Sequence, residues 1–107
     1  MESLPYPDNV GKKSRRWTAI DGQPVSVVIE EEIKIPQKTG PHKKLIYLQR
    51  LRFESDGHIE YRFTYYMEGF KGKTKGKWVF GQYSLSVPAE DLAELLKQAR
   101  AKGWEGF

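Results

Sequence analysis

Cysteine is absent from the 107 residues of this chain. Its absence excludes disulfide bonds, thiolate metal sites and thiol nucleophiles, and it is typical of proteins that work in a reducing compartment. Long apolar runs are also absent, since none approaches the roughly 18 residues that a membrane-spanning helix needs. The first residues lack a basic segment followed by an apolar one. We therefore expect no secretory signal, no membrane partner and a cytoplasmic location.

Histidine is scarce, and His42 and His58 each lie in or beside a predicted turn. They do not have the spacing of a metal-ligand pair, and neither has a local acid that would complete a nucleophile–base pair. Gly69, Gly72 and Gly76 lack the spacing of a phosphate-binding loop before a helix. We expect no cofactor, no bound metal and no catalytic residue.

Alternating apolar and polar residues make up most of the remaining sequence, a pattern typical of half-buried β-strands. The predicted strands cover residues 25–35, 44–54, 58–68 and 77–87, and a short additional strand can form around residues 17–20. Ser55-Asp56-Gly57 predicts a tight hairpin turn, because Asp-Gly readily takes positive φ angles. Gly81 interrupts the last strand, which indicates a bulge or a close backbone approach.

In the first strand, Val27, Ile29, Ile33 and Ile35 alternate with polar or smaller residues, so strict alternation places them on one face. In the third strand, Tyr61, Phe63 and Tyr65 alternate in the same way and are expected to pack in the core. Glu30, Glu31 and Glu32 are expected to form a solvated strand end or to pair with cross-strand arginines.

A helix is predicted after Pro88, with acidic residues in its first turn and an apolar stripe at helical spacing. The stripe consists of Leu92, Leu95, Leu96 and Ala99. Gly103 is expected to end the helix in a Schellman motif, with Trp104 as its apolar partner. The sequence predicts an α+β fold: an antiparallel sheet of four to five strands with one C-terminal helix packed on one face. Residues 1–24 form an N-terminal arm and residues 25–107 the domain.

Positive charge is unevenly distributed, since the net charge is +4 overall but −1 over residues 89–107. Cations and aromatic residues cluster in the arm, the strands and the 69–77 loop, as on surfaces that bind single-stranded nucleic acid. The predicted contacts are Lys12, Lys13, Arg15, Arg16, Arg50, Arg52, Arg62, Tyr66, Lys71, Lys73, Lys75, Lys77, Trp78 and Phe80. An alternative without a binding function is that the loop lysines only keep the hairpin soluble.

The segment 76–104 combines a basic, glycine-containing stretch, a strand containing Ser-Leu, an acidic helix start and a leucine-rich helix. Its matching residues are Gly81, Ser84, Leu85, Pro88, Glu90, Leu92 and Leu95. This order resembles the Whirly and positive-cofactor-type single-stranded DNA-binding fold, and the element order is similar to the Pur-alpha repeat. The resemblance implies a curved sheet that binds single strands, with helices that help form a dimer. By that analogy the 71–78 lysines and Trp78 lie on a β-ribbon, and Arg50, Arg52 and Arg62 on an open sheet face.

We therefore predict a non-catalytic domain whose partner is single-stranded DNA or RNA. One alternative is a protein-interaction module, a homodimeric accessory protein that buries the same aromatic residues. A second is a metal-dependent nuclease, because Glu32-Ile33-Lys34 with Asp21 upstream is similar to the PD-(D/E)xK arrangement of acids and lysine around a divalent metal.

Overall fold

The computed structural model describes residues 5–18, 22, 24–38, 43–69, 72–81 and 84–107, with the backbone alone described at 14–18 and 24. Its elements are β1 (Lys13–Thr18), β2 (Pro24–Pro36), β3 (Lys44–Phe53), β4 (Ile59–Glu68), the 3-10 turn η1 (Gly72–Thr74), β5 (Trp78–Phe80) and α1 (Ala89–Ala101). The strands form one antiparallel sheet in chain order. The predicted α+β fold is confirmed.

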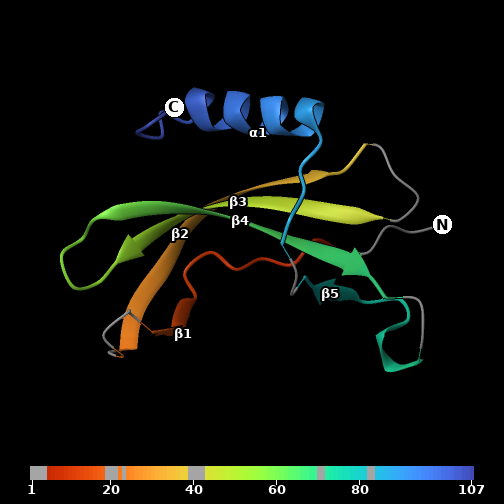
Figure 1. Cartoon of the computed structure of the whole chain (residues 1–107), viewed down its shortest axis with the longest axis horizontal. Coiled ribbons are helices and arrows are strands. Elements are labelled where there is room, and N and C mark those ends of the chain that lie inside the picture. Colours follow the sequence, from red (N-terminus) through yellow and green to blue (C-terminus); the bar gives the residue numbers. More distant parts are fainter. Residues whose placement is uncertain (1–4, 19–21, 23, 39–42, 70–71, 82–83) are drawn as a thin grey trace.

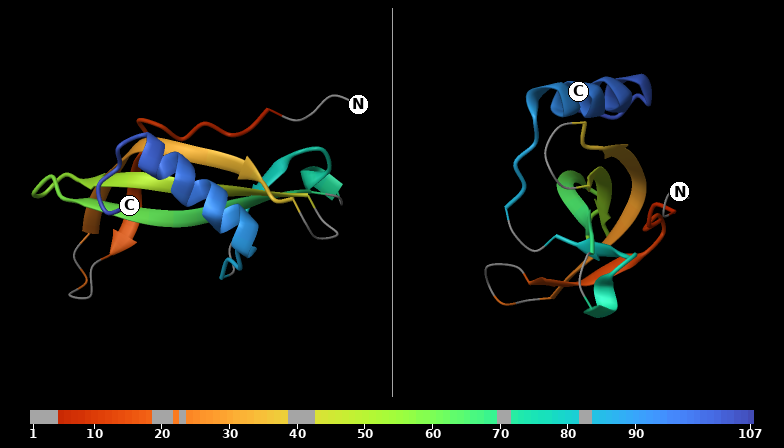
Figure 2. Two further views of the ribbon diagram at one scale, coloured as in Figure 1. Left: turned by 90° about the horizontal axis from the view of Figure 1, so that it is seen from above. Right: turned by 90° about the vertical axis from the view of Figure 1, so that its right-hand side faces the viewer.

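The sheet is strongly curled, and its two faces are covered by different segments. α1 lies across one face, while β1 and β5 curve toward the opposite side (Figures 1 and 2). We call the face beneath α1 the helix face and the opposite one the arm face. Within the described part of the chain, no helix has the length and hydropathy that crossing a bilayer requires.

A β-bulge in β2 decides which of its residues face α1. The pairing with β3 shifts by one residue between Ile29 and Glu31. Because paired residues share a face, the shift places Val27 on the arm face with Ile29, and Ile33 and Ile35 on the helix face. Strict alternation, which predicts one face for all four, is wrong here because the bulge adds one residue to β2.

Both faces of the central strand β3 are buried. On the helix face, the core consists of Ile33, Ile35, Ile46, Leu48, Leu95, Ala99 and Trp104. On the arm face, Leu45, Tyr47 and Leu51 are fully buried. Burial of both faces requires a second cover besides α1.

That second cover is the arm segment, residues 5–12. The hydroxyl of Tyr47 donates a hydrogen bond to the carbonyl of Pro7. The backbone N–H and the side-chain amide of Asn9 donate to Glu32, at 3.0 and 2.9 Å. The face opposite the helix is thus partly covered by the chain's own N-terminal segment, and the arm also supplies β1.

The buried stripe of α1 differs in part from the predicted one. Leu95 and Ala99 are fully buried as predicted, and Asp91 in the first turn is buried with them. Leu92 is 36% exposed and Leu96 is partly buried. The helix therefore faces β2 with its i, i+4, i+8 row rather than with its leucine pairs.

The end of α1 is a Schellman motif, as predicted. Gly103 has a φ of 75°, its N–H donates to the carbonyl of Arg100, and the N–H of Trp104 donates to the carbonyl of Ala99. Trp104 is buried and stacks on Tyr61, with ring centroids 5.5 Å apart. The cap thus turns the last apolar side chain back onto the sheet.

The three aromatic residues of β4 on the helix face differ in burial. Tyr65 is 7% exposed, and Tyr61 is partly buried beneath Trp104, as expected for core residues. Phe63 is 40% exposed, so its predicted place in the core is wrong. The cause is the position of α1, which packs over β2 and leaves the outer part of β4 uncovered.

β5 is shorter than the predicted strand 77–87, because it ends at Phe80 just before Gly81. The N–H of Gly81 donates to the carbonyl of Tyr65 at 2.7 Å, and in the segment before α1 Leu85 packs against the core. A Cβ atom at Gly81 would overlap the ring of Tyr65. The close backbone approach predicted at Gly81 is confirmed.

We expect Gly81→Ala to destabilise the protein by about 1–3 kcal/mol, since the added methyl group forces the Tyr65 ring or the backbone to move. Urea denaturation measures the change in the free energy of unfolding. Ser84→Ala, an exposed position nearby, is the control and should change stability little. Equal stability of Gly81→Ala and the parent protein would contradict the close contact.

Candidate nucleic-acid interface

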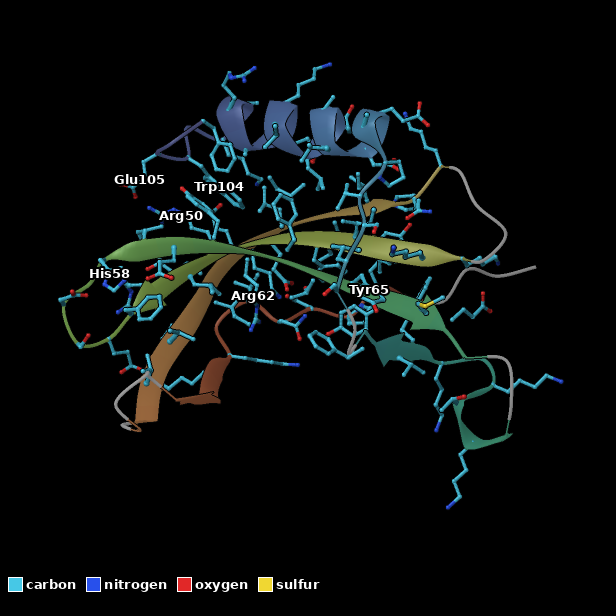
Figure 3. All side chains as sticks on the ribbon, viewed as in Figure 1. Arg50, His58, Arg62, Tyr65, Trp104 and Glu105 are labelled. Carbon is cyan, nitrogen blue, oxygen red and sulfur yellow. The ribbon has the colours of Figure 1, made fainter. Side chains whose placement is uncertain are left out.

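The three predicted sheet arginines do not share one face. Arg50 lies opposite Tyr61 and Arg62 opposite Gln49 in the β3–β4 ladder. Paired residues share a face and neighbours alternate, so Arg50 and Arg52 lie on the helix face and Arg62 on the arm face. Figure 3 shows Arg50 and Arg62 on opposite sides of the sheet. The prediction of a single open face carrying all three is wrong.

Arg50 and Arg52 are held by carboxylates. Glu30 accepts hydrogen bonds from both, at 2.5 Å from Arg50 and 2.6 Å from Arg52. Arg50 also bonds Glu105, 2.7 Å away, in the segment after α1. Pairing of the β2 glutamates with cross-strand arginines is thus confirmed for Glu30. The charges of Arg50 and Arg52 are therefore largely neutralised by carboxylates of the protein itself.

These side chains line an open pocket between the β3–β4 hairpin and the C-terminal segment. Its lining consists of Glu30, Arg50, Arg52, Gly57, His58, Ile59, Tyr61, Glu105 and Gly106. Both signs of charge are present, so the pocket has no strong preference for an anion. Figure 3 shows Arg50, Trp104 and Glu105 grouped beneath the end of α1.

The protonation of His58, which lines this pocket, is expected to make the stability of the protein depend on pH. The expectation that His58 has no acid nearby is wrong, because its ring nitrogens bond Glu60 at 2.8 Å and Asp56 at 2.5 Å. These bonds raise the pKa of His58 above its ordinary value of 6.5. A raised pKa means that the folded state holds the proton more tightly than the unfolded one. The stabilisation is present below pH 6.5 and is lost as the pH rises through the folded-state pKa.

The Glu60→Gln variant removes the first of these bonds, so we expect it to lower the pKa of His58. NMR titration of the His58 imidazole measures that value directly. The gain in stability on going from pH 8 to pH 5.5 should shrink in the same variant. A His58 pKa that does not move would show that Glu60 has no electrostatic effect on the ring.

Arg62 and Tyr66 belong to a polar and aromatic network on the arm face. Arg62 donates two hydrogen bonds to the side-chain Oε1 of Gln49, at 2.9 and 2.7 Å, and the side-chain Nε2 of Gln49 donates to Glu32 at 2.6 Å. Burial lowers the pKa of Arg62 from its usual range. Tyr66 packs against Tyr47, with ring centroids 5.1 Å apart. Arg62 is thus held by Gln49 within this network.

The acid of the nuclease-like tripeptide is part of the same network. The side chain of Glu32 is 1% exposed, and its oxygens accept bonds from Asn9 and Gln49, with Lys34 3.7 Å away. Asp21 lies outside the described residues. Among the residues described, no group of three or more His, Asp or Glu side chains is arranged to hold a metal ion. Glu32 anchors the arm segment.

The predicted arm cations divide into two groups. Lys12 and Lys13 are exposed, and Lys13 forms an ion pair with Glu54 at 3.4 Å. Arg15 and Arg16 lie in β1, but their side chains are outside the described part of the structure. The arm therefore contributes Lys12 as an exposed cation without a carboxylate partner among the described residues.

The β4–β5 connection carries a group of exposed lysines. Lys73, Lys75 and Lys77 are exposed and have no ion pair with any described residue, while Lys71 lies outside the described ranges. Beyond them, β5 presents Phe80, which is 46% exposed. We call Lys73, Lys75, Lys77, Trp78 and Phe80 the hairpin surface.

Aromatic rings extend the hairpin surface on the arm face. Phe80 lies edge-on to Tyr66, with ring centroids 5.4 Å apart, and Trp78 lies edge-on to Tyr6, 6.2 Å away. Tyr6 is itself 43% exposed. Sequence reasoning missed Tyr6 because the proline-rich arm has no periodic pattern. Its flanking prolines, which favour an extended chain, were the available signal.

Comparison with protein-family models, with curated proteins and with solved structures found no match to this chain. The hairpin surface therefore has to be interpreted from its own chemistry. It combines lysines that have no ion pair with a described residue with the exposed ring of Phe80, whereas the sheet arginines are engaged by carboxylates or belong to the arm-face network.

Proposed function

We propose that this protein binds single-stranded nucleic acid at the hairpin surface, without catalysis. The observation that carries the proposal is the exposed ring of Phe80 on the same β-hairpin as Lys73, Lys75 and Lys77, none of which is paired with a carboxylate of the described residues. Such lysines track phosphates, and an exposed ring stacks a base with a gain of about 1–3 kcal/mol.

The proposed site, the hairpin surface, is smaller than the set of fourteen contact residues predicted from the sequence. Arg50 and Arg52 gain little from a phosphate, because Glu30 already holds them at 2.5 and 2.6 Å. Lys12, an exposed cation of the arm segment, stays a proposed contact outside the hairpin surface. The curled sheet with a protruding β-hairpin supports the Whirly-type analogy, in which a β-ribbon contacts the strand, and the cysteine-free composition supports a cytoplasmic location.

Fluorescence anisotropy with a labelled 20-mer of single-stranded DNA or RNA tests this function. Titrations at two salt concentrations and with a duplex control separate phosphate contacts from strand preference. We expect tighter binding to the single strand and an affinity that falls steeply with salt. Absence of binding at low salt would show that the lysines serve solubility and would refute the proposal.

A further inference from the structure

The outer edge of β4 is only partly covered by β5. β5 pairs with residues 66–68 of β4, and the segment 59–64 has no strand partner on that side among the described residues. Phe63 in this segment is 40% exposed, and Glu60 is exposed as well. An unpaired strand edge beside an exposed aromatic residue is a template for pairing with another chain.

The hydrogen bonds around β4 identify which of its backbone groups point outward. The carbonyl of His58 and the N–H of Glu68 bond to β3, and the carbonyl of Tyr65 accepts a bond from Gly81 on the outer side. In an antiparallel ladder these directions alternate residue by residue. The N–H and C=O groups of Ile59, Tyr61 and Phe63 therefore point away from β3.

We propose that a second copy of this chain pairs antiparallel with this edge, about a two-fold axis at Tyr61. In this register Tyr61 lies opposite Tyr61 of the second copy. The outward N–H of each Tyr61 donates a hydrogen bond to the outward C=O of the other. Ile59 of each copy faces Phe63 of the other, on the helix face. Glu60 of each copy faces Arg62 of the other, on the arm face. The segment is thus complementary to itself in hydrogen bonds, apolar contacts and charge.

Charge also selects this register over its neighbours. Outward-pointing groups must face each other, so the register can change only by moving the symmetry axis one residue along the strand. A shift toward the N-terminus places Glu60 opposite Glu60, and a shift toward the C-terminus places Arg62 opposite Arg62. Like charges directly opposite each other destabilise a strand pair.

Existing contacts of these side chains are compatible with the pairing. Glu60 bonds His58 through one carboxylate oxygen, at 2.8 Å, and Arg62 bonds Gln49. A carboxylate accepts several bonds and a guanidinium donates up to five, so each side chain can serve a second partner. Because the axis is perpendicular to the sheet, the two sheets become continuous and both helices lie on the same side.

Sedimentation velocity over a range of protein concentrations tests the proposal. We expect the parent chain to form dimers, and both Glu60→Arg and Arg62→Glu to weaken dimerisation about tenfold or more, since each places like charges opposite each other. Mixing the two variants should restore a dimer, because every facing pair is then of opposite sign. Lys97→Glu, on the exposed side of α1, changes the net charge by the same amount as Arg62→Glu and is the control for that variant.

A backbone variant gives a test that does not depend on charge. Phe63→Pro removes an outward N–H while leaving the bonds between β3 and β4 intact, so it should abolish dimers in a protein that remains folded by circular dichroism. A parent chain that stays monomeric at high concentration would overturn the proposal. Dimers that survive both Glu60→Arg and Phe63→Pro would also overturn it. These outcomes do not depend on nucleic-acid binding.

Discussion

Replacing Lys73, Lys75 and Lys77 together with glutamate is expected to weaken single-strand binding at least about a hundredfold at low salt. Each lysine that contacts a phosphate releases bound counterions, and the dependence of log K on log salt has a slope of about −0.7 per contact for single strands. Losing three contacts should flatten that slope by about 2 units. Anisotropy titrations of the parent and the variant at several salt concentrations measure both quantities.

The matched control reverses three exposed cations elsewhere, Lys38, Lys97 and Arg100. It changes the net charge by the same amount, so an effect of overall charge would weaken both triple variants alike. Binding that survives the hairpin replacement but not the control would move the site away from the hairpin surface. Phe80→Ala adds a second check, because loss of stacking should weaken binding about fivefold or more with little change in salt slope.

Leu95→Ala should lower the free energy of unfolding by about 2–5 kcal/mol, the largest stability change we expect from a single truncation. The side chain is fully buried between α1 and the sheet residues of the helix-face core, including Ile33 and Leu48. Truncation leaves a cavity where α1 meets β2. Chemical denaturation monitored by tryptophan fluorescence measures the loss.

Leu92→Ala is the matched control on the same helix. Leu92 is 36% exposed, so its truncation removes the same number of atoms from a site that solvent already reaches. We expect a loss well below that of Leu95→Ala. Equal losses would mean that α1 packs with its predicted leucine stripe, contrary to the burial of Asp91, Leu95 and Ala99.

Element type and order could be predicted from the sequence because they depend on local signals. Alternation identified the long strands, and the Gly103-Trp104 pair specified the Schellman cap that the structure contains. Gly81 indicated a close backbone approach, since no side chain fits above Tyr65. Each signal acts within a few residues of the chain, where backbone preference and side-chain size decide the conformation.

The division of residues between the two faces could not be predicted. The bulge between Ile29 and Glu31 reverses the alternation of β2, and nothing in a Glu-Glu-Glu run marks which residue is extra. The same bulge brings Glu30 to Arg50 and Arg52 and sends Glu32 to the arm face. Of the predicted phosphate contacts, Arg50 and Arg52 are thereby engaged by Glu30, and Arg62 is bonded to Gln49.

The sequence by itself determined the strands, the hairpin turn, the helix with its cap, and a basic hairpin with lysines at 73, 75 and 77. Only the tertiary structure decided which cations carboxylates engage, that the arm covers the face opposite α1, and that no described residue pairs with the outer edge of β4 at residues 59–64. The reason is physical. Local propensity fixes the form of each segment, whereas pairing register, bulges and chain length between strands fix which side chains meet.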